Sequence, residues 1–335
     1  MRWRYLAVAC GLLVAMQASF AEGPPDTGGA TSGSSPSEIA GYFTTAGVVR
    51  FQLTGGRLRL DPIRHRKGSQ QVSQNDVEES ISVTSERGIP SLQYAYRSPH
   101  RYLTLSVEHS EAVRIESWTP GLNRRSVLDQ PKSGPITWTL TGAPGSDPDA
   151  APEVYQGNTL LHLRAANTAA FGRDFDPLIG RLLRGRTIGN VVEETNGKLM
   201  EMMAVGDLID PEQFQDAVDG LSAPRRVTRA TSFQKLASWG TCAIPLIREL
   251  PDDRLDSEQT LQIEQLLKRT RRCTDDTGAS LAALLLHDRT YWKLVLPNAT
   301  AHQRELVRTR LNQRQNGGHP ITPESEHQLA SVVTE

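Results

Sequence analysis

The sequence predicts an α+β fold, with an antiparallel β domain followed by an all-α domain. Between residues 42 and 141, apolar and polar residues alternate, which is the period of a strand with one buried face. From residue 153 to residue 315, apolar residues recur every three or four positions, as in amphipathic helices. Residues 142–152 are rich in Pro, Gly and Asp and show neither period, so they are predicted to be a linker.

Seven short runs of alternating residues predict the strands of the β domain. Turn residues such as Gly55-Gly56 and Ser133-Gly-Pro135 separate the runs. The one-sided pattern indicates a sheet with one covered face and one wet face, and the cover is either a second sheet or the helices. The seven runs are Val49–Leu53, Leu58–Leu60, Ile81–Val83, Tyr94–Tyr96, Leu103–Val107, Val113–Ile115 and Ile136–Leu140.

Capping residues mark where several helices of the second domain begin. Asp210-Pro211 places a cap before a proline in the first turn, and Asp288 precedes a helix with Trp292. Asp256 with Gln259, and Thr300 with Gln303, have the spacing of capping boxes. Other helices are expected around the apolar positions Leu160–Leu163, Leu178–Leu183, Ile188–Met203 and Leu281–Leu285.

The segment Arg229–Leu250 predicts a helical hairpin. Leu236, with nearby Phe233 and Trp239, gives the first helix an apolar face, and Gly240 permits the left-handed turn that ends it. Pro245 falls in the first turn of the second helix, where no hydrogen bond is lost.

The spacing Arg229, Ser232, Leu236, Gly240, Ala243, Pro245, Ile247 resembles a HEAT-type helical repeat, although Ser232 stands where such repeats often carry Ala. Together with the Leu160–Leu163, Asp176–Leu183 and Leu255–Gln259 segments, it is similar to an uncharacterised family of secreted bacterial proteins with a β-rich front and a HEAT-like back. The resemblance implies a HEAT-like helical domain over residues 153–315 and export. It implies no activity.

The first 21 residues are predicted to be a signal peptide. Arg2 and Arg4 precede an apolar run of about a dozen residues, and Ser19 and Ala21 occupy the −3 and −1 positions of a cleavage site. We therefore expect a secreted, periplasmic or cell-envelope location, with no membrane span after cleavage. Residues 22–41 are expected to form a flexible leader and residues 316–335 a disordered tail.

Charge and cysteine content restrict the partners. The chain has 37 Lys+Arg and 38 Asp+Glu, and removing Arg2 and Arg4 leaves a mature net charge of −3. Because this excludes a clear basic excess, we expect no nucleic-acid partner. Cys242 and Cys273 remain after cleavage; export permits a disulfide between them, and two small buried side chains are the alternative.

No recognisable catalytic, cofactor-binding or metal-binding motif occurs, so no catalytic, cofactor-binding or metal residue is assigned and no cofactor is expected. His162 is expected to be a packed core histidine. Asp288 beside His287 is expected to cap a helix, and so are Asp275 and Asp276, which are too few for a calcium site. The basic groups around Arg225–Arg229 and Lys268–Arg272 suit solvated helix ends, with an acidic partner as the alternative.

These observations favour a secreted protein–protein interaction or scaffold module that binds another protein through its helical domain. The alternatives are carbohydrate or cell-wall binding by the sheet, and a hydrolase with no recognisable motif. Exposure of the sheet faces distinguishes the first two, because a bare aromatic face would indicate ligand binding. The candidate aromatic residues on the strands are Tyr94, Tyr96, Trp118 and Trp138.

Overall fold

A computed structural model describes residues 49–65, 67–74, 76–142, 151–205, 208–270 and 274–315. It has the α+β class expected from the sequence, with the β region first. The predicted signal peptide, the leader and the predicted disordered tail all lie outside the described residues.

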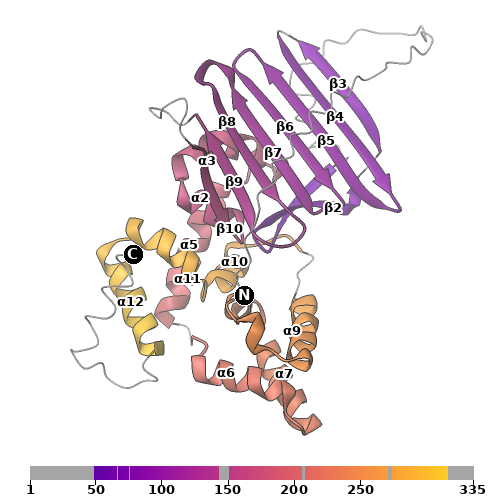
Figure 1. Ribbon diagram of the computed structural model, residues 1–335. Helices are drawn as coiled ribbons and strands as arrows, with labels where there is room; N and C mark the ends of the chain where they lie inside the picture. Colours follow the sequence, from indigo (N-terminus) through magenta and orange to yellow (C-terminus); the bar gives the residue numbers. More distant parts are fainter. Residues whose placement is uncertain are drawn as a thin grey trace. The chain divides into compact units, whose positions relative to one another are not determined.

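Eight antiparallel strands form the main sheet (Figure 1). Each strand lies beside its neighbours in sequence, in the order β10-β9-β8-β7-β6-β5-β4-β3. Hairpins therefore make every connection, and the sheet is a meander. The strands are β3 (Gly68–Gln74), β4 (Val77–Glu86), β5 (Ile89–Ser98), β6 (Arg101–Glu108), β7 (Ala112–Thr119), β8 (Arg124–Gln130), β9 (Ile136–Thr141) and β10 (Glu153–Gly157).

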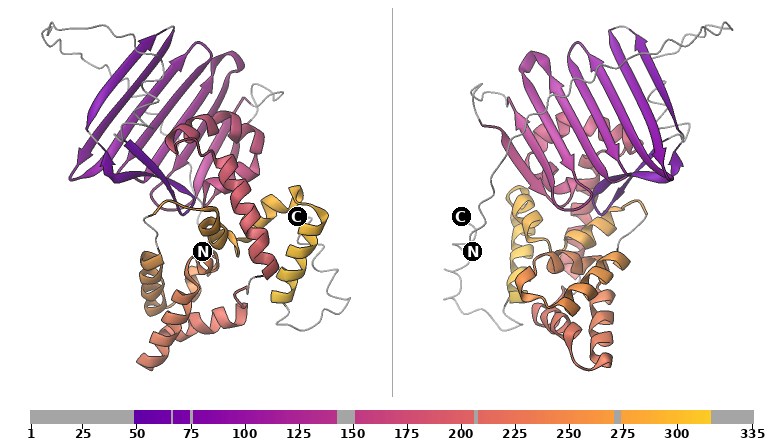
Figure 2. Two further views of the ribbon diagram at one scale, coloured as in Figure 1. Left: turned by 180° about the vertical axis from the view of Figure 1, so that it is seen from behind. Right: turned by 45° about the vertical axis from the view of Figure 1, so that its right-hand side comes forward.

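One face of the sheet forms the core. Strand register aligns its inward side chains in rows, the central row being Ile81, Tyr94, Leu105, Ile115, Leu128, Trp138 and Tyr155. Trp138 is fully buried and stacks on Tyr155 at 4.6 Å between ring centroids. Phe171 and Phe175 meet the same indole edge-on at 5.8 and 5.7 Å. Helices therefore cover this face, and the left view of Figure 2 shows them in front of the sheet.

A separate hairpin also packs on the core face. Strands β1 (Val49–Thr54) and β2 (Arg57–His65) pair only with each other among the described residues. The amide of Gln130 holds this hairpin: it accepts from Leu58 N (2.9 Å) and donates to Leu58 O (2.7 Å). Arg57 adds bonds to the carbonyls of Gly134 and Pro131, at the β8–β9 turn. Both a second strand pair and the helices therefore cover the sheet.

The seven predicted runs all fall in strands, but three strands were missed. The linker expected at residues 142–152 connects β9 to β10, so the sheet continues to Gly157 and the helices begin at Leu160, not at residue 153. Strand β8 was missed because its inward positions include Arg124, Ser126 and Gln130, which are polar but buried. Strand β3 was missed because its sequence, GSQQVSQ, has a single apolar residue.

Most helices share the core of the sheet. Leu160, Leu161 and Leu163 of α2 are fully buried there, and α5 packs along α10. Asp288 caps α11 as predicted by accepting from Tyr291 N at 3.0 Å, and Thr300 and Gln303 form the predicted capping box. This group comprises α2 (Leu160–Ala166), α3 (Thr168–Asp174), α4 (Asp176–Leu182), α5 (Ile188–Val205), α10 (Gly278–Leu285), α11 (Arg289–Val295) and α12 (Ala301–Gln315).

The remaining helices surround a second core of their own, which includes Phe214, Leu236, Ile247 and Leu266. Two predicted caps are confirmed here: Asp210 accepts from Glu212 N (3.0 Å), and Asp256 and Gln259 form a reciprocal capping box. We call this group the α6–α9 bundle. It contains α6 (Pro211–Asp219), η2 (Gly220–Ser222), α7 (Arg226–Ser238), η3 (Gly240–Ala243), α8 (Ile244–Arg248) and α9 (Ser257–Thr270).

The predicted hairpin Arg229–Leu250 lies within the α6–α9 bundle. Gly240 has the left-handed φ of +57° expected after the first helix, and Pro245 lies in the first turn of α8. Helix α8 has only 5 residues, whereas α7 has 13. Helix α7 packs against α6 and α9. The hairpin is therefore one part of a larger bundle, and its assignment to a HEAT-like repeat stays a prediction.

Across the described residues, no helix combines the length and apolar character that crossing a membrane requires.

Candidate functional site

The structure separates the four aromatic candidates on the sheet. Tyr94 and Trp138 are buried on the core face, and Tyr96 packs against the same core. Trp118 lies on the opposite face with 42% of its surface exposed. Only Trp118 is therefore available to a ligand.

Trp118 belongs to a row of side chains that crosses the other face of the sheet. No described helix or strand covers this face, which we call the open face. Tyr102 stacks on Trp118 with 4.9 Å between centroids and 22° between planes, and the guanidinium of Arg97 lies 5.3 Å from the centre of the Tyr102 ring. We call this set the aromatic row. Its members follow in strand register from β4 to β9: Glu78, Arg97, Tyr102, Trp118, Arg125 and Thr141.

Among the described residues, the ion pairs of the open face involve Arg114 and Arg125 but not Arg97. Arg114 bonds to Glu116 (2.8 Å) and Asp129 (2.5 Å), and Arg125 also bonds to Glu116 (2.8 Å). Burial acts to raise the pKa of Glu116, but the bonds from Arg125 and Arg114 outweigh it and hold that pKa below its ordinary value. Arg97 has no ion pair within the part of the chain that is described, so its charge faces solvent beside the aromatic stack.

Hydroxyl and amide side chains are concentrated on the open face over β3–β6, whereas Val127 and exposed Val154 lie on the same face toward β10. The hydroxyl and amide groups surround a shallow depression of about 330 Å³ over β3–β6, lined by Gln71, Ser80, Ser82, Gln93 and Thr104 among others. Each of these groups both donates and accepts hydrogen bonds. The open face therefore combines an aromatic stack, a cation with no carboxylate partner in the described ranges, and many neutral polar groups.

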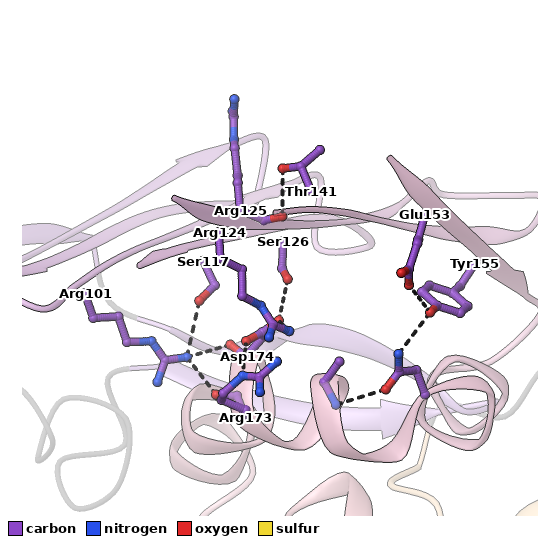
Figure 3. Close-up of polar contacts among 12 residues, drawn as sticks. Arg101, Ser117, Arg124, Arg125, Ser126, Thr141, Glu153, Tyr155, Arg173 and Asp174 are labelled. Atoms are coloured by element: carbon purple, nitrogen blue, oxygen red, sulfur yellow. Dashed lines mark hydrogen bonds and ion pairs between the residues drawn. The ribbon is translucent and has the colours of Figure 1, made fainter. Parts of the chain in front are cut away.

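The core face carries a buried ionic cluster around Asp174 (Figure 3). Arg124 is 2% exposed and donates to Asp174 Oδ2 at 2.6 Å, and Ser126 donates to the same oxygen. Arg101 donates to the carbonyls of Asp174 (2.7 Å) and Arg173 (3.2 Å) at the end of α3. Burial raises the pKa of Asp174, although Ser126 and Arg173 act against it. The cluster joins α3 to strands β6 and β8 of the sheet.

A second polar cluster joins α4 to the other half of the sheet. Tyr94 Oη donates to Glu79 (2.5 Å), and Arg181 donates to Glu79 (2.7 Å) and to Tyr94 Oη (3.2 Å). Burial raises the pKa of Tyr94 far above its ordinary value, so the phenol stays protonated and donates to the carboxylate. These groups bond to one another, which indicates a structural role.

His162 was predicted to be a packed core histidine, and it is fully buried. Its Nδ1 lies 2.9 Å from Thr159 Oγ1, and its Nε2 lies 3.2 Å from Asp288 Oδ2. These three residue types also occur in catalytic triads, where a hydroxyl nucleophile and a carboxylate contact opposite nitrogens of a histidine. Here Thr159 is 1% exposed and the hydroxyl contacts Nδ1, so the network fastens α2 to α11.

The pairing of Asp288 was not predicted, because 126 residues separate it from His162. Burial acts to raise the pKa of Asp288, but the hydrogen bond and charge of His162 outweigh it and lower that pKa below its ordinary value. His287, the neighbour of Asp288, accepts instead from Ile209 N at 3.3 Å.

Asp275 and Asp276 do not cap α10, contrary to prediction. Thr277 is the cap, in a capping box with Ser280. The two carboxylates instead accept from Leu53 N and Gly56 N of the β1–β2 hairpin, each at 2.8 Å. The sequence placed them correctly beside a helix start but did not reveal a partner more than 200 residues away.

The basic groups of the α6–α9 bundle make local contacts. Arg229 donates to the carbonyls of Ala223 (2.9 Å) and Pro224 (3.1 Å) before α7. Arg269 lies 5.1 Å from the ring centre of Phe233, and Lys268 lies 3.5 Å from Glu264. Arg271 and Arg272 lie outside the described residues.

Within the described ranges, no three His, Cys, Asp or Glu side chains gather closely enough to hold a metal ion. Cys242 is half-buried and packs at the edge of both cores, whereas Cys273 lies outside the described residues. The disulfide between them therefore stays a prediction.

Comparison with known proteins gives no relative: the chain matches no family model, no curated protein and no solved structure.

Proposed function

We propose that this protein is an exported glycan-binding protein whose ligand lies on the open face of the eight-stranded sheet. The observation that carries the proposal is the aromatic row, in which the Tyr102–Trp118 stack stands on an uncovered face beside Arg97. Export rests on the predicted signal peptide at residues 1–21.

The chemistry of the open face favours a sugar over an apolar ligand. A glycan presents hydroxyl groups together with C–H surfaces. The open face offers hydroxyl and amide groups that can bond to the sugar hydroxyls, and an aromatic pair that can pack against the C–H surfaces. Protein interfaces usually have an apolar, fully buried centre. The neighbouring row of the open face mixes polar and apolar side chains and has no continuous apolar centre: its members are Ser80, Ala95, Thr104, Glu116, Val127, Thr139 and Val154. Val154, which is 58% exposed, is its most exposed large apolar side chain.

The buried clusters do not favour an enzyme. The networks around Asp174 and Glu79 are buried between the sheet and the helices, and the network around His162 is buried between α2 and α11. A substrate would have to displace the core to reach any of them. The open face, by contrast, needs no rearrangement to receive a ligand, which is the usual condition of a preformed binding site.

Affinity electrophoresis tests the proposal, with gels that contain peptidoglycan fragments, polygalacturonate or a neutral β-glucan. We expect at least one polymer to retard the mature protein. Trp118→Ala should then weaken the retardation at least about ten-fold in apparent Kd, equivalent to about 1.4 kcal/mol. Leu122→Ala is the matched control, because Leu122 is also exposed (63%) but lies in η1 (Pro120–Leu122), outside the strands.

Two results would contradict the proposal. The first is a mature, folded protein that no polymer retards. The second is retardation that Trp118→Ala leaves unchanged, because the ligand would then lie elsewhere.

A protein partner of the α6–α9 bundle is the second candidate. Val227 on α7 is 77% exposed and Leu261 on α9 is 50% exposed, and these two helices pack against each other. Cross-linking in the native envelope fraction, with Val227→Asp and Leu261→Asp as variants, tests it. Loss of a cross-linked product in both variants would support this role, and an identical product would exclude it.

A further inference from the structure

Strand β3 is an edge of the main sheet. It pairs with β4 on one side, from Gly68↔Val83 to Gln74↔Val77, and with no described strand on the other. A strand edge carries backbone donors and acceptors that can pair with another strand. The seven residues of β3 therefore present a row of such groups.

This edge lacks the features that usually prevent association. Proteins protect an edge with charged side chains, proline, a bulge or a very short strand. Strand β3 has the sequence GSQQVSQ, which contains no charge and no proline, and its register with β4 is regular. The opposite edge strand, β10, is protected in these ways: it has only 5 residues, begins with the charged Glu153 and packs against α2.

On the open face of the sheet, the side chains of β3 are self-complementary about the centre of the strand. In an antiparallel pair of two identical strands with Gln71 opposite Gln71, Ser69 lies opposite Ser73 and Gln70 opposite Val72. Amide lies against amide and hydroxyl against hydroxyl, on the same face of the sheet. Exposed Lys67 and Asp76 flank the strand at its two ends, so antiparallel pairing also brings opposite charges near each other.

We propose that β3 is a homodimerisation edge, at which a second copy of the chain pairs antiparallel around Gln71 and joins two eight-stranded sheets into one. Such a contact is two-fold symmetric, as most homodimer interfaces are. The open faces of both copies then lie on the same side of the joined sheet, because strand alternation continues across the pair.

Charge reversal at the two-fold axis tests this proposal. Gln71 is exposed, so the isolated chain tolerates a charge there. We expect sedimentation velocity on the mature wild type to show a monomer–dimer equilibrium between about 1 µM and 1 mM, the range expected for a small interface. Gln71→Lys and Gln71→Glu should each be monomeric, because like charges oppose each other across the axis.

An equimolar mixture of Gln71→Lys and Gln71→Glu should restore the dimer. This rescue distinguishes strand pairing at Gln71 from a variant that has lost its fold. Gln93→Lys is the matched control, since Gln93 is exposed on the open face of β5, away from the edge, and should leave the dimer intact.

Three results would overturn the proposal. They are a wild type that stays monomeric at every concentration, a dimer that both Gln71 variants retain, and a mixture that stays monomeric. The second would place the dimer contact on another surface. The first or the third result would mean that the edge of β3 faces solvent or pairs with another segment of its own chain.

Discussion

The carboxylate of Asp288 lies 3.2 Å from Nε2 of His162, and this contact joins the start of α11 to α2. Both side chains are buried, and Thr159 occupies the other imidazole nitrogen. Asp288 also caps α11 through Tyr291 N. The Asp288 carboxylate therefore both caps α11 and joins α11 to α2.

Asp288→Asn should lower the free energy of unfolding by about 1–3 kcal/mol, because asparagine keeps the cap but loses the charge toward His162. The folded pKa of Asp288 lies below its ordinary value of 3.8. Its stabilisation is therefore complete above that value and is lost as pH falls through the folded pKa. Urea titrations across this range should show the wild-type advantage shrinking below about pH 4.

Asp210→Asn is the control for this effect. Asp210 also caps a helix but contacts no histidine, so the substitution should change stability by only a few tenths of a kcal/mol. An equal loss in both variants would mean that the charge of Asp288 toward His162 adds nothing to stability.

The buried pair Arg124–Asp174 should be strongly coupled. Arg124→Met leaves a buried carboxylate with Ser126 and half-exposed Arg173, and we expect a loss of about 3 kcal/mol. The double variant with Asp174→Asn should lose less than the sum of the single losses, measured by urea denaturation. Arg114→Met, in a pair that is 44% and 47% exposed, should cost less than about 1 kcal/mol. Additive losses at Arg124 and Asp174 would contradict the coupling.

Alanine substitutions at two neighbouring glycines can distinguish the cost of backbone strain from the cost of a steric clash. Gly55 (φ +60°) and Gly56 (φ +72°) both have left-handed backbone in the β1–β2 turn. A Cβ at Gly55 would meet nothing within 4 Å, but one at Gly56 would lie 2.6 Å from Thr159 Cβ. We expect Gly55→Ala to cost about 1 kcal/mol and Gly56→Ala about 1–3 kcal/mol more, by thermal or urea unfolding. Equal losses would mean that the hairpin can move away from Thr159.

Local chemistry explains which features the sequence predicts well. The capping box of Asp256 and Gln259 closes within one helical turn, so its spacing alone identifies it. The turn at Gly55-Gly56 is equally local. In contrast, Arg124 meets Asp174 across 50 residues, and no spacing rule predicts such a pair.

Tertiary packing explains the missed strand β8. Hydrophobic alternation identifies a strand when its inward side chains are apolar. In β8, Arg124 and Ser126 face inward and both donate to Asp174 on α3, and Gln130 faces inward and bonds to the β1–β2 hairpin. The aromatic row was hidden for a related reason, since Tyr102 and Trp118 become neighbours only through strand register.

Arg97 should give the open face a preference for acidic glycans. Its guanidinium lies beside Tyr102 without a carboxylate partner among the described residues, so it can pair with a uronate on a ligand that reaches the stack. We expect Arg97→Gln to weaken binding of polygalacturonate about ten-fold, while binding of a neutral β-glucan stays unchanged. Added salt should weaken polygalacturonate binding by the wild type more than by the variant, because salt screens an exposed ion pair.

Arg114→Gln is the control, since Arg114 is already paired with Glu116 and Asp129. Equal effects of Arg97→Gln on both polymers would assign Arg97 to holding Tyr102 in place instead of selecting the ligand.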